Sequence, residues 1–252
     1  MNPPRKNFLK WSDDSKFDAA VYRFMPFHRL EEMCERKQNC LVRLRLWDDP
    51  FENFLFSADA VEADGRHIDL AYRNDFYGQC WTDADETDAM WRIYSHDKDG
   101  VRVRCTPRKL LAGLYASEDS KFREICHFIG KVTYHPVEEL TALLENPDFV
   151  RRVVWNGDGA KQCETLLLKR TEFTHESEVR LLHQLPATDA GAGDLFFYPL
   201  DPCSMFDELV LDPRLEKNAA DSRNARLTDL GFTCQIRQSS LYQLPKLVAR
   251  LG

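Results

Sequence analysis

The chain has 252 residues, of which 43% are hydrophobic and 30% are charged, a balance typical of a folded globular protein. Its formal net charge of -7 argues against a whole-surface electrostatic grip on nucleic acid, although a local basic groove remains compatible with it. No apolar stretch approaches the length needed to cross a bilayer, so the sequence predicts no membrane partner.

The eight cysteines lie far apart and include no C-x-x-C pair, a spacing that argues against a zinc site. Residues 1–10 lack the apolar run of a signal peptide. We therefore expect reduced thiols that behave as small buried groups, no metal, and a cytoplasmic location.

The first half of the chain predicts alternating strands and helices. They are a strand at 20–25, a helix at 27–36, a strand at 41–46, one or two strands within 66–81, a helix entered at 82–88, and a strand at 101–105. In the strand at 41–46, alternation predicts that Arg43 and Arg45 share one face. Asp48-Asp49-Pro50 then ends that strand, because proline cannot continue the hydrogen-bond ladder.

The second half predicts a helix at 106–114, a strand at 128–134, a helix from 136, a mainly helical region at 146–173, a strand at 178–182 and a β-α-β unit at 206–211, 215–230 and 234–239. Together these patterns predict one α+β domain over residues 1–252, with a mixed, mainly antiparallel central sheet and flanking helices. We expect mobility in residues 1 to about 15 and in 186–194.

Charge gathers immediately before the strand at 178–182, in Lys169–Arg180. One interpretation is that Glu176, Glu178 and Arg180 alternate onto the solvated face of an edge strand. The other is that Glu178 points into a cleft, where a carboxylate can bind a sugar hydroxyl and stabilise developing positive charge. Glu176 competes with Glu178 for that place.

Aromatic residues are dense in a second segment, which runs from Tyr77 through Trp81 and Thr82 to Ser95. Ala89, Met90, Ile93 and Tyr94 recur at helical spacing, which predicts a buried stripe. Trp91 and Arg92 lie off that stripe, so they need another partner or a ligand.

Two further segments precede these, and a surface salt bridge or turn is an alternative interpretation of each. Tyr22-Arg23-Phe24-Met25 lies on the first predicted strand, where Arg23 could hold a phosphate in fixed geometry. Asp49-Pro50-Phe51-Glu52 follows the second. The common phosphate-loop, dinucleotide-fold, zinc-protease and serine-hydrolase motifs do not occur.

Taken in chain order, these four segments resemble the bacterial family called Domain of Unknown Function twenty-nine seventy-one. The matching stretches are Tyr22–Met25, Asp49–Glu52, Cys80–Tyr94 and Glu176–Arg180. More distantly, their order is similar to that of ADP-ribosyltransferases, which place a polar residue on a first strand, an aromatic or serine segment on a middle strand and a glutamate on a late strand.

The ADP-ribosyltransferase similarity implies that NAD is the substrate and that the site needs no metal. It implies that Arg23 contacts the NAD phosphate or ribose and that Trp81 or Tyr94 stacks on nicotinamide. Further contributions to NAD binding are expected from Tyr22, Thr82, Trp91, Arg92, Ser95 and Arg180. Glu178, or Glu176 in its place, would bind the ribose hydroxyl and favour the loss of nicotinamide.

The leading hypothesis is therefore an ADP-ribosyltransferase-like enzyme, such as a toxin or anti-phage effector, that modifies a protein or nucleic-acid acceptor. A non-catalytic nucleotide- or protein-binding module that uses Arg23, Trp91 and Arg92 is a second hypothesis. A third is a Mg²⁺-dependent nuclease that uses Asp48, Asp49, Glu176 and Glu178.

Overall fold

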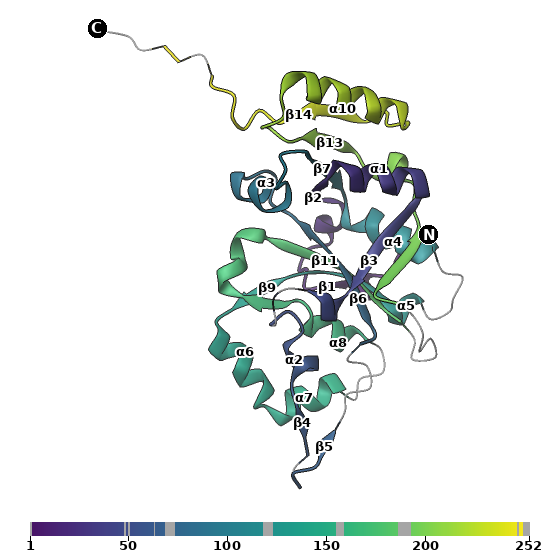
Figure 1. Ribbon diagram of the computed structural model, residues 1–252. Coiled ribbons are helices and arrows are strands. Elements are labelled where there is room, and N and C mark those ends of the chain that lie inside the picture. Colours follow the sequence, from purple (N-terminus) through teal and green to yellow (C-terminus); the bar gives the residue numbers. More distant parts are fainter. Residues whose placement is uncertain are drawn as a thin grey trace. The chain divides into compact units, whose positions relative to one another are not determined.

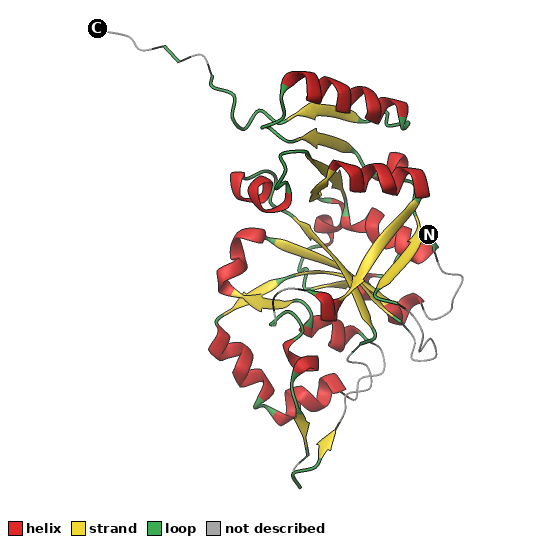
Figure 2. Ribbon diagram, viewed as in Figure 1, coloured by secondary structure: helices red, strands yellow, loops and turns green. Residues whose placement is uncertain are grey.

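The computed structural model describes residues 2–47, 49, 51–62, 64–68, 74–117, 123–154, 159–185, 193–245 and 247–248 (Figure 1). The chain divides into two compact units, each made of several segments. Unit 1 comprises residues 1–21, 38–84 and 106–200, and unit 2 comprises 22–37, 85–105 and 201–252. Each unit combines helices with strands (Figure 2), which confirms the predicted α+β class. That they act as one domain stays a prediction.

The sheet of unit 1 has β11 (Glu178–Gln184) between two antiparallel neighbours, β8 (His127–Lys131) and β6 (Phe76–Thr82). β1 (Phe8–Leu9) extends the sheet beside β8 in parallel. β3 (Gln38–Arg43) pairs antiparallel with β6, and β12 (Leu195–Pro199) pairs antiparallel with β3. The sheet is mixed and mainly antiparallel, as predicted.

Side chains of β11 alternate between the two faces of this sheet. Glu178, Arg180 and Leu182 point to one side, which we call the carboxylate face, together with their cross-strand partners Thr82, Cys80 and Gly78. Val179, Leu181 and His183 point to the other side, the histidine face, with Trp81, Gln79 and Tyr77. Every residue of β11 except its last is buried.

A small parallel ribbon accompanies the sheet of unit 1, formed by β9 (Thr133–His135) and β10 (Leu168–Arg170). Three helices pack in sequence beside it, α6 (Val137–Leu144), α7 (Pro147–Val154) and α8 (Ala160–Thr165). Leu140, Val153, Leu167 and Leu182 belong to the core that joins helices, ribbon and sheet. The region predicted as mainly helical at 146–173 therefore also contains a strand.

The other elements of unit 1 are short, apart from one helix. They are α2 (Phe54–Ser57), β4 (Ala60–Val61), β5 (His67–Ile68), α4 (Pro107–Ala116), α5 (Arg123–Cys126) and 3-10 helices at Arg5–Asn7, Asp14–Asp18, Leu44–Leu46 and Thr171–Glu176. α4 begins with Thr106, whose hydroxyl caps the amide of Lys109, and with Pro107 in its first turn. This helix packs against β8.

The strands of unit 2 are ordered β2 (Val21–Pro26), β7 (Gly100–Cys105), β13 (Glu208–Leu211) and β14 (Gln235–Gln238). β13, α10 (Lys217–Asp229) and β14 form the predicted β-α-β unit, and the two strands are parallel. The remaining helices are α1 (Phe27–Arg36), α3 (Asp88–Tyr94) and α9 (Pro202–Met205).

Two predicted side-chain patterns are wrong. β3 ends at Arg43 and the chain turns into a 3-10 helix, so Arg43 and Arg45 do not share a strand face. On α3 it is Met90 and Trp91 that are buried, with the Trp91 ring edge-on to Phe24 at 4.8 Å. Ile93 and Tyr94 are exposed instead, because the helix of unit 2 turns its Met90–Trp91 edge to the core.

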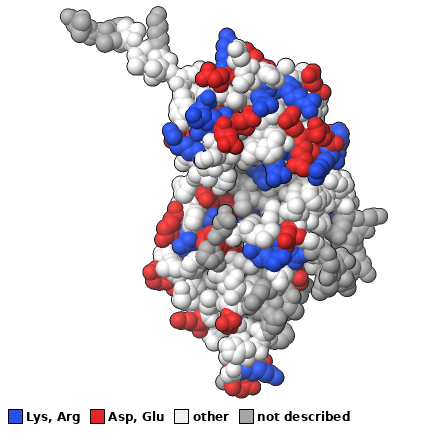
Figure 3. All heavy atoms as spheres, in the orientation of Figure 1, with Lys and Arg blue, Asp and Glu red and all other residues white. Residues whose placement is uncertain are grey.

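Acidic and basic side chains are interspersed over the α1 and α10 surface of unit 2, on the face drawn in Figure 3. Arg226 of α10, for example, pairs with Glu31 and Glu35 of α1.

All eight cysteines are free thiols. Among the described residues, no helix is long and apolar enough to cross a membrane. The predicted mobile segment 186–194 lies mostly outside the described residues, and the mobility of the N-terminal residues stays a prediction.

Candidate active site at the start of strand β11

The backbone at residues 176–178 is fixed by contacts to β6 and β9. A 3-10 helix ends at Glu176, and Ser177 takes a left-handed conformation with φ of 44° before β11 begins. The Thr82 hydroxyl donates to the Glu176 carbonyl oxygen at 2.6 Å, and the Asp83 amide donates to the Ser177 carbonyl at 3.0 Å. These bonds hold Glu176 at the edge of the sheet and turn Glu178 inward.

Glu178 is held by Arg180, its neighbour two residues along on the same face. The Arg180 Nε donates to Oε1 of Glu178 at 2.8 Å, and its Nη2 donates to Oε2 at 2.8 Å. The backbone amide of Glu178 donates to Tyr134 Oη at 2.8 Å. Such a bidentate guanidinium fixes both the position and the orientation of a carboxylate.

Lys169 of β10 joins three carboxylates. Its ammonium nitrogen lies 2.5 Å from Oε2 of Glu176, 2.8 Å from Oε1 of Glu52 and 3.2 Å from Oε2 of Glu178. Arg180 also donates to Oε1 of Glu52 at 2.8 Å. We call these five residues, Glu52, Lys169, Glu176, Glu178 and Arg180, the carboxylate cluster. Three acids against two bases give it a formal charge of -1.

The charge state of the cluster follows from a contest between burial and neighbouring charges. Burial alone would raise the pKa of Glu178, but Arg180 and then Lys169 outweigh it and lower that pKa to about 2. Burial would likewise lower the pKa of Lys169, yet the carboxylates around it raise it. For Glu52 burial wins, and its pKa is raised. Glu178 and Lys169 are therefore both charged at neutral pH.

Aromatic rings cover the cations of the cluster. The Arg180 guanidinium lies over the Trp47 ring at 4.6 Å, and the Lys169 ammonium lies over Phe173 at 4.6 Å. Trp47 approaches β6 closely at Gly78, where a Cβ atom would come within 2.7 Å of the indole. Glycine at 78 is thus required for Trp47 to pack on the carboxylate face.

Solvent access separates the two glutamates predicted as catalytic. The side chain of Glu178 is 3% exposed, and both of its oxygens accept from Arg180. The side chain of Glu176 is 14% exposed and accepts from Lys169 through Oε2. Glu176 is thus the more exposed of the two carboxylates, and Glu178 is the more deeply buried.

The edge-strand interpretation of this segment is wrong. β11 lies between β8 and β6, and Arg180 is completely buried, so the side chains of Glu178 and Arg180 do not face solvent. Glu178 and Arg180 can both be buried because their charges pair with each other. A pattern of charged and apolar residues in alternation is the same for a buried ion pair and for a solvated face, so the sequence does not tell them apart.

Trp81, predicted to stack on nicotinamide, lies on the histidine face, opposite to Glu178. Its indole Nε1 donates to Oε1 of Gln79 at 2.9 Å. Gln79 Nε2 in turn donates to Oδ1 of Asn39 at 2.8 Å, and Asn39 Nδ2 donates to Tyr198 Oη at 2.7 Å. Trp81 is therefore part of a buried neutral network, and its neighbour Thr82 is the residue that contacts the Glu176 segment.

Six predicted NAD-binding residues lie in unit 2, and two of them, Tyr22 and Trp91, take part in contacts inside this unit. The Arg102 guanidinium lies over the Tyr22 ring at 4.4 Å. Trp91 is fully buried, and its Nε1 donates to Oε1 of Glu86 at 2.6 Å. Arg23, the third of the six, is half-buried on β2.

The remaining three lie at or just beyond the end of α3. Arg92 is exposed and pairs with Asp88 at 2.8 Å. Tyr94 is 38% exposed, whereas Ser95 is buried and its hydroxyl donates to Oδ2 of Asp212 at 2.5 Å. Of these three, Arg92 and Tyr94 are the exposed ones.

The acidic residues predicted for a nuclease are mostly committed to cations. Glu176 and Glu178 bind Lys169, and Asp49 accepts from Arg170 at 2.9 Å. Asp48 lies outside the described residues. Within the described part of the chain, no group of three or more His, Cys, Asp or Glu side chains is arranged to hold a metal ion.

Three members of the site had no predicted role, namely Glu52, Lys169 and Tyr134. Glu52 belongs to the Asp49–Glu52 segment and Lys169 opens the charged segment, so both lay within stretches marked by composition. Glu52 and Lys169 are 117 positions apart, so no local sequence pattern predicts their contact. No sequence pattern predicted the contact of Tyr134 with Glu178 either.

Comparison with known proteins gives distant structural likeness alone. No family model matches the chain, so the resemblance to Domain of Unknown Function twenty-nine seventy-one stays a prediction. No curated protein matches. Three solved structures of DarT from Thermus sp. 2.9 align over 88% of this chain, each at 8% identity. The alignment with the NAD+ complex has a TM-score of 0.37, and that with the carba-NAD+ complex has a TM-score of 0.38; each covers 96% of the DarT chain. The alignment with the complex that contains ADP-ribosylated single-stranded DNA has a TM-score of 0.39 and covers 94% of the DarT chain.

Proposed function

We propose that this protein is an NAD-dependent ADP-ribosyltransferase-like enzyme in which Glu176 acts on the nicotinamide ribose and Glu178 positions it. The observation that carries the proposal is the pairing of an accessible and a buried glutamate on one lysine at the start of β11. A toxin or anti-phage effector is the setting we propose for the activity, and NAD is the proposed substrate.

The reaction needs a carboxylate that stays ionised. When the bond between C1′ of the ribose and the nicotinamide nitrogen breaks, the electron pair leaves with nicotinamide and C1′ becomes an oxocarbenium-like centre. An acceptor oxygen or nitrogen then bonds to C1′ and releases its proton. A carboxylate fixed near C1′ stabilises the developing positive charge and accepts a hydrogen bond from a ribose hydroxyl.

The cluster supplies a fixed negative charge beneath the carboxylate proposed to act on the ribose. Because Arg180 and Lys169 outweigh burial, Glu178 has a pKa of about 2 and stays negative at neutral pH. Its charge keeps Lys169 in place, and Lys169 holds Glu176 through Oε2. This order of contacts orients an accessible carboxylate on a rigid base, which is the requirement for electrostatic catalysis.

Lys169 has a second consequence for the alternatives. Its ammonium lies among the carboxylates that a divalent cation would need, so Mg²⁺ binding would have to displace a buried lysine. We therefore rank metal-dependent nuclease activity below ADP-ribosyl transfer. A non-catalytic binding module remains distinguishable from both, because it would bind NAD without releasing nicotinamide.

The test uses the purified full chain with NAD labelled on the adenine side, and with protein and single-stranded oligonucleotide acceptors in separate reactions. Nicotinamide release and label transfer are measured for the wild type, Glu176→Gln and Glu172→Gln. Glu172 lies on the same 3-10 helix but is exposed, and so provides a matched control.

We expect Glu176→Gln to lower nicotinamide release by about 100-fold, the effect of removing one preorganised charge-stabilising group. Glu172→Gln should stay within about twofold of the wild type, because the charge it removes is solvated. Equal rates for the wild type and Glu176→Gln would remove the proposed role of this carboxylate. NAD binding without nicotinamide release would instead support the binding module.

A further inference from the structure

A pocket lies in unit 1, on the other side of the β9–β10 ribbon from the carboxylate cluster. In the paired strands, Tyr134 and Lys169 contact the cluster, and the residues that alternate with them, Thr133, His135 and Leu168, line the pocket. Alternation along a strand places the two sets on opposite faces of the ribbon. The pocket is thus a separate site that the proposed reaction does not use.

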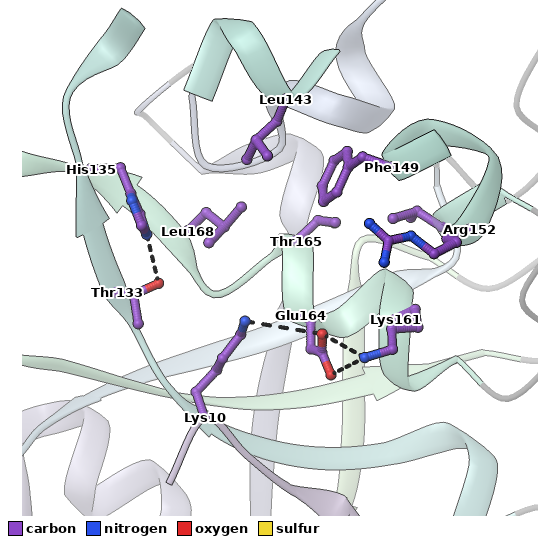
Figure 4. A pocket seen from close by; sticks show the side chains of 11 residues that line it. Lys10, Thr133, His135, Leu143, Phe149, Arg152, Lys161, Glu164, Thr165 and Leu168 are labelled. Atoms are coloured by element: carbon purple, nitrogen blue, oxygen red, sulfur yellow. Dashed lines mark hydrogen bonds and ion pairs between the residues drawn. The ribbon is translucent and has the colours of Figure 1, made fainter. Parts of the chain in front are cut away.

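The pocket has the size of a small-molecule site. Its volume is about 400 Å³, within the range of roughly 300–1,000 Å³ typical of ligand pockets. Helices α6, α7 and α8 contribute its walls, together with the ribbon and Lys10 (Figure 4). A cavity of this volume can accommodate one ring system with an attached group.

Basic side chains outnumber acidic ones around it. Lys10, Arg152 and Lys161 line the pocket with a single carboxylate, that of Glu164. Glu164 pairs with Lys161 at 2.9 Å and with Lys10 at 4.0 Å. One acid against three bases leaves two positive charges, so the pocket favours an anion.

Lys10 reaches the pocket from the residue directly after β1, the strand that ends at Leu9. Its ammonium points toward Glu164 (Figure 4), and its side chain is 34% exposed. Arg152 is on an exposed turn of α7, and its Nε donates to the Asp148 carbonyl, which leaves the outer edge of the guanidinium facing the pocket (Figure 4).

The opposite part of the pocket is apolar. Leu143 and Phe149 lie together across Thr165 from the charged side chains Lys161 and Glu164 (Figure 4). An inorganic anion would leave this wall uncovered, whereas a flat ring would pack against Phe149. The hydroxyl of Thr165, which donates to the Gln162 carbonyl, still has lone pairs to accept from a ring or sugar hydrogen.

We propose that this pocket binds a small organic anion that carries a flat ring, of the nucleoside monophosphate class, with its phosphate at Lys10 and Arg152 and its base against Phe149. The proposal is independent of the proposed function, since it concerns binding at a site on the other face of the ribbon.

The test is equilibrium binding of adenosine monophosphate to the full chain by calorimetry, beside inorganic phosphate and adenosine. The wild type should bind adenosine monophosphate at one site, at least tenfold more tightly than either of the other two probes. Equal binding of adenosine would overturn the anionic part of the proposal, and equal binding of phosphate would overturn the apolar part. Absence of saturable binding of adenosine monophosphate would overturn the whole.

Matched variants locate the binding. Arg152→Ala and Lys10→Gln should each weaken adenosine monophosphate binding at least fivefold. Arg151→Ala and Lys6→Gln should leave it within twofold, because these neighbours are exposed cations that do not line the pocket. Equal effects of the two members of either pair would contradict the assignment. Because the readout is binding, the result does not depend on NAD turnover, so the two proposals fail separately.

Discussion

The two faces of the unit 1 sheet bury ionisable groups to a similar depth but in different charge states. On the carboxylate face, Glu178 is 2% exposed, and its pKa falls to about 2 because Arg180 and Lys169 outweigh burial. On the histidine face, His183 is fully buried, and burial lowers its pKa to about 3. The first group is charged and the second neutral at pH 7.

Partners account for this difference. Glu178 lies against two cations, whereas His183 stacks among rings, 4.8 Å from His127 and 4.1 Å from Phe196. Beside it, Asn39, Gln79, Trp81 and Tyr198 satisfy one another without any charge. Burial alone disfavours the charged form, and counter-charges reverse that preference. The face with the reversed preference is the one that presents an accessible carboxylate, that of Glu176.

The largest loss of stability is expected when the carboxylate face loses the Arg180 guanidinium. Arg180→Ala leaves Glu178 and Glu52 buried beside Lys169 alone, which should lower the free energy of unfolding by about 3–5 kcal/mol. Urea denaturation at pH 7 measures it. Arg170→Ala, which removes the more exposed partner of Asp49, is the control and should cost less. A loss below about 1 kcal/mol for Arg180→Ala would contradict the account.

A charge introduced on the histidine face should lower the free energy of unfolding by somewhat less. In Gln79→Glu, the oxygen that replaces Nε2 would face two acceptors, Oδ1 of Asn39 and the Cys40 carbonyl. We expect a loss of about 2–3 kcal/mol in unfolding free energy at pH 8 and a smaller loss at pH 5, where the carboxyl takes up a proton. Denaturation at both pH values measures the difference. A loss independent of pH would show that shape, rather than charge, governs this network.

The free energy of unfolding of the wild type should depend on pH in two separate ranges, one for each face of the sheet. The pKa of His183 is lower in the folded chain than in the unfolded one, so its contribution is complete above about pH 6.5 and is lost as pH falls toward 3. Between pH 7 and 5 this amounts to about 2 kcal/mol. The pKa of Glu178 is also depressed, so its contribution is lost at lower pH, from about 4.3 down to 2.

Replacing His183 with phenylalanine should therefore reduce the loss of stability between pH 7 and 5, whereas the loss below pH 4 should persist. Denaturation curves at closely spaced pH values measure both. His175→Gln is the control, since His175 is exposed and lies outside the histidine face. An unchanged slope between pH 7 and 5 in His183→Phe would mean that this histidine does not remain neutral in the folded chain.

The smallest effect is expected for an exposed pair. Arg92 of α3 pairs with Asp88 one turn away, with its side chain 63% exposed. Because solvent screens such pairs, Arg92→Ala should change the unfolding free energy by about 0.5 kcal/mol or less. A larger change would indicate that the Tyr242 hydroxyl, 3.5 Å from Nη2 of Arg92, adds to this pair. Binding of NAD to the same variant would test its predicted contribution to a ligand site.

Periodicity predicted much of the fold. The α+β class, the mixed sheet, helix α1 and the β13-α10-β14 unit follow from local patterns, since apolar spacing and turn residues act over a few positions. It could not predict the burial of Arg180 or Arg102, because a basic residue that alternates with apolar ones is typical of a solvated face.

The candidate site shows the same division. The charged segment before β11 marked Glu176 and Glu178, but their unequal access depends on Thr82, Lys169 and Arg180, which converge from separate strands. The prediction that Trp81 joins Glu178 in one site rested on sequence order, which does not give the register between two strands. Trp81 pairs with Val179 and therefore faces the other side of the sheet from Glu178.

The most direct test of the central claim is the ratio of nicotinamide release by Glu176→Gln to that of the wild type, measured at pH 7 on chains shown to have equal urea midpoints. The account predicts a ratio of about 0.01, because the accessible carboxylate is lost while Glu178, Arg180 and Lys169 keep the strand in place. A ratio near 1 would contradict it.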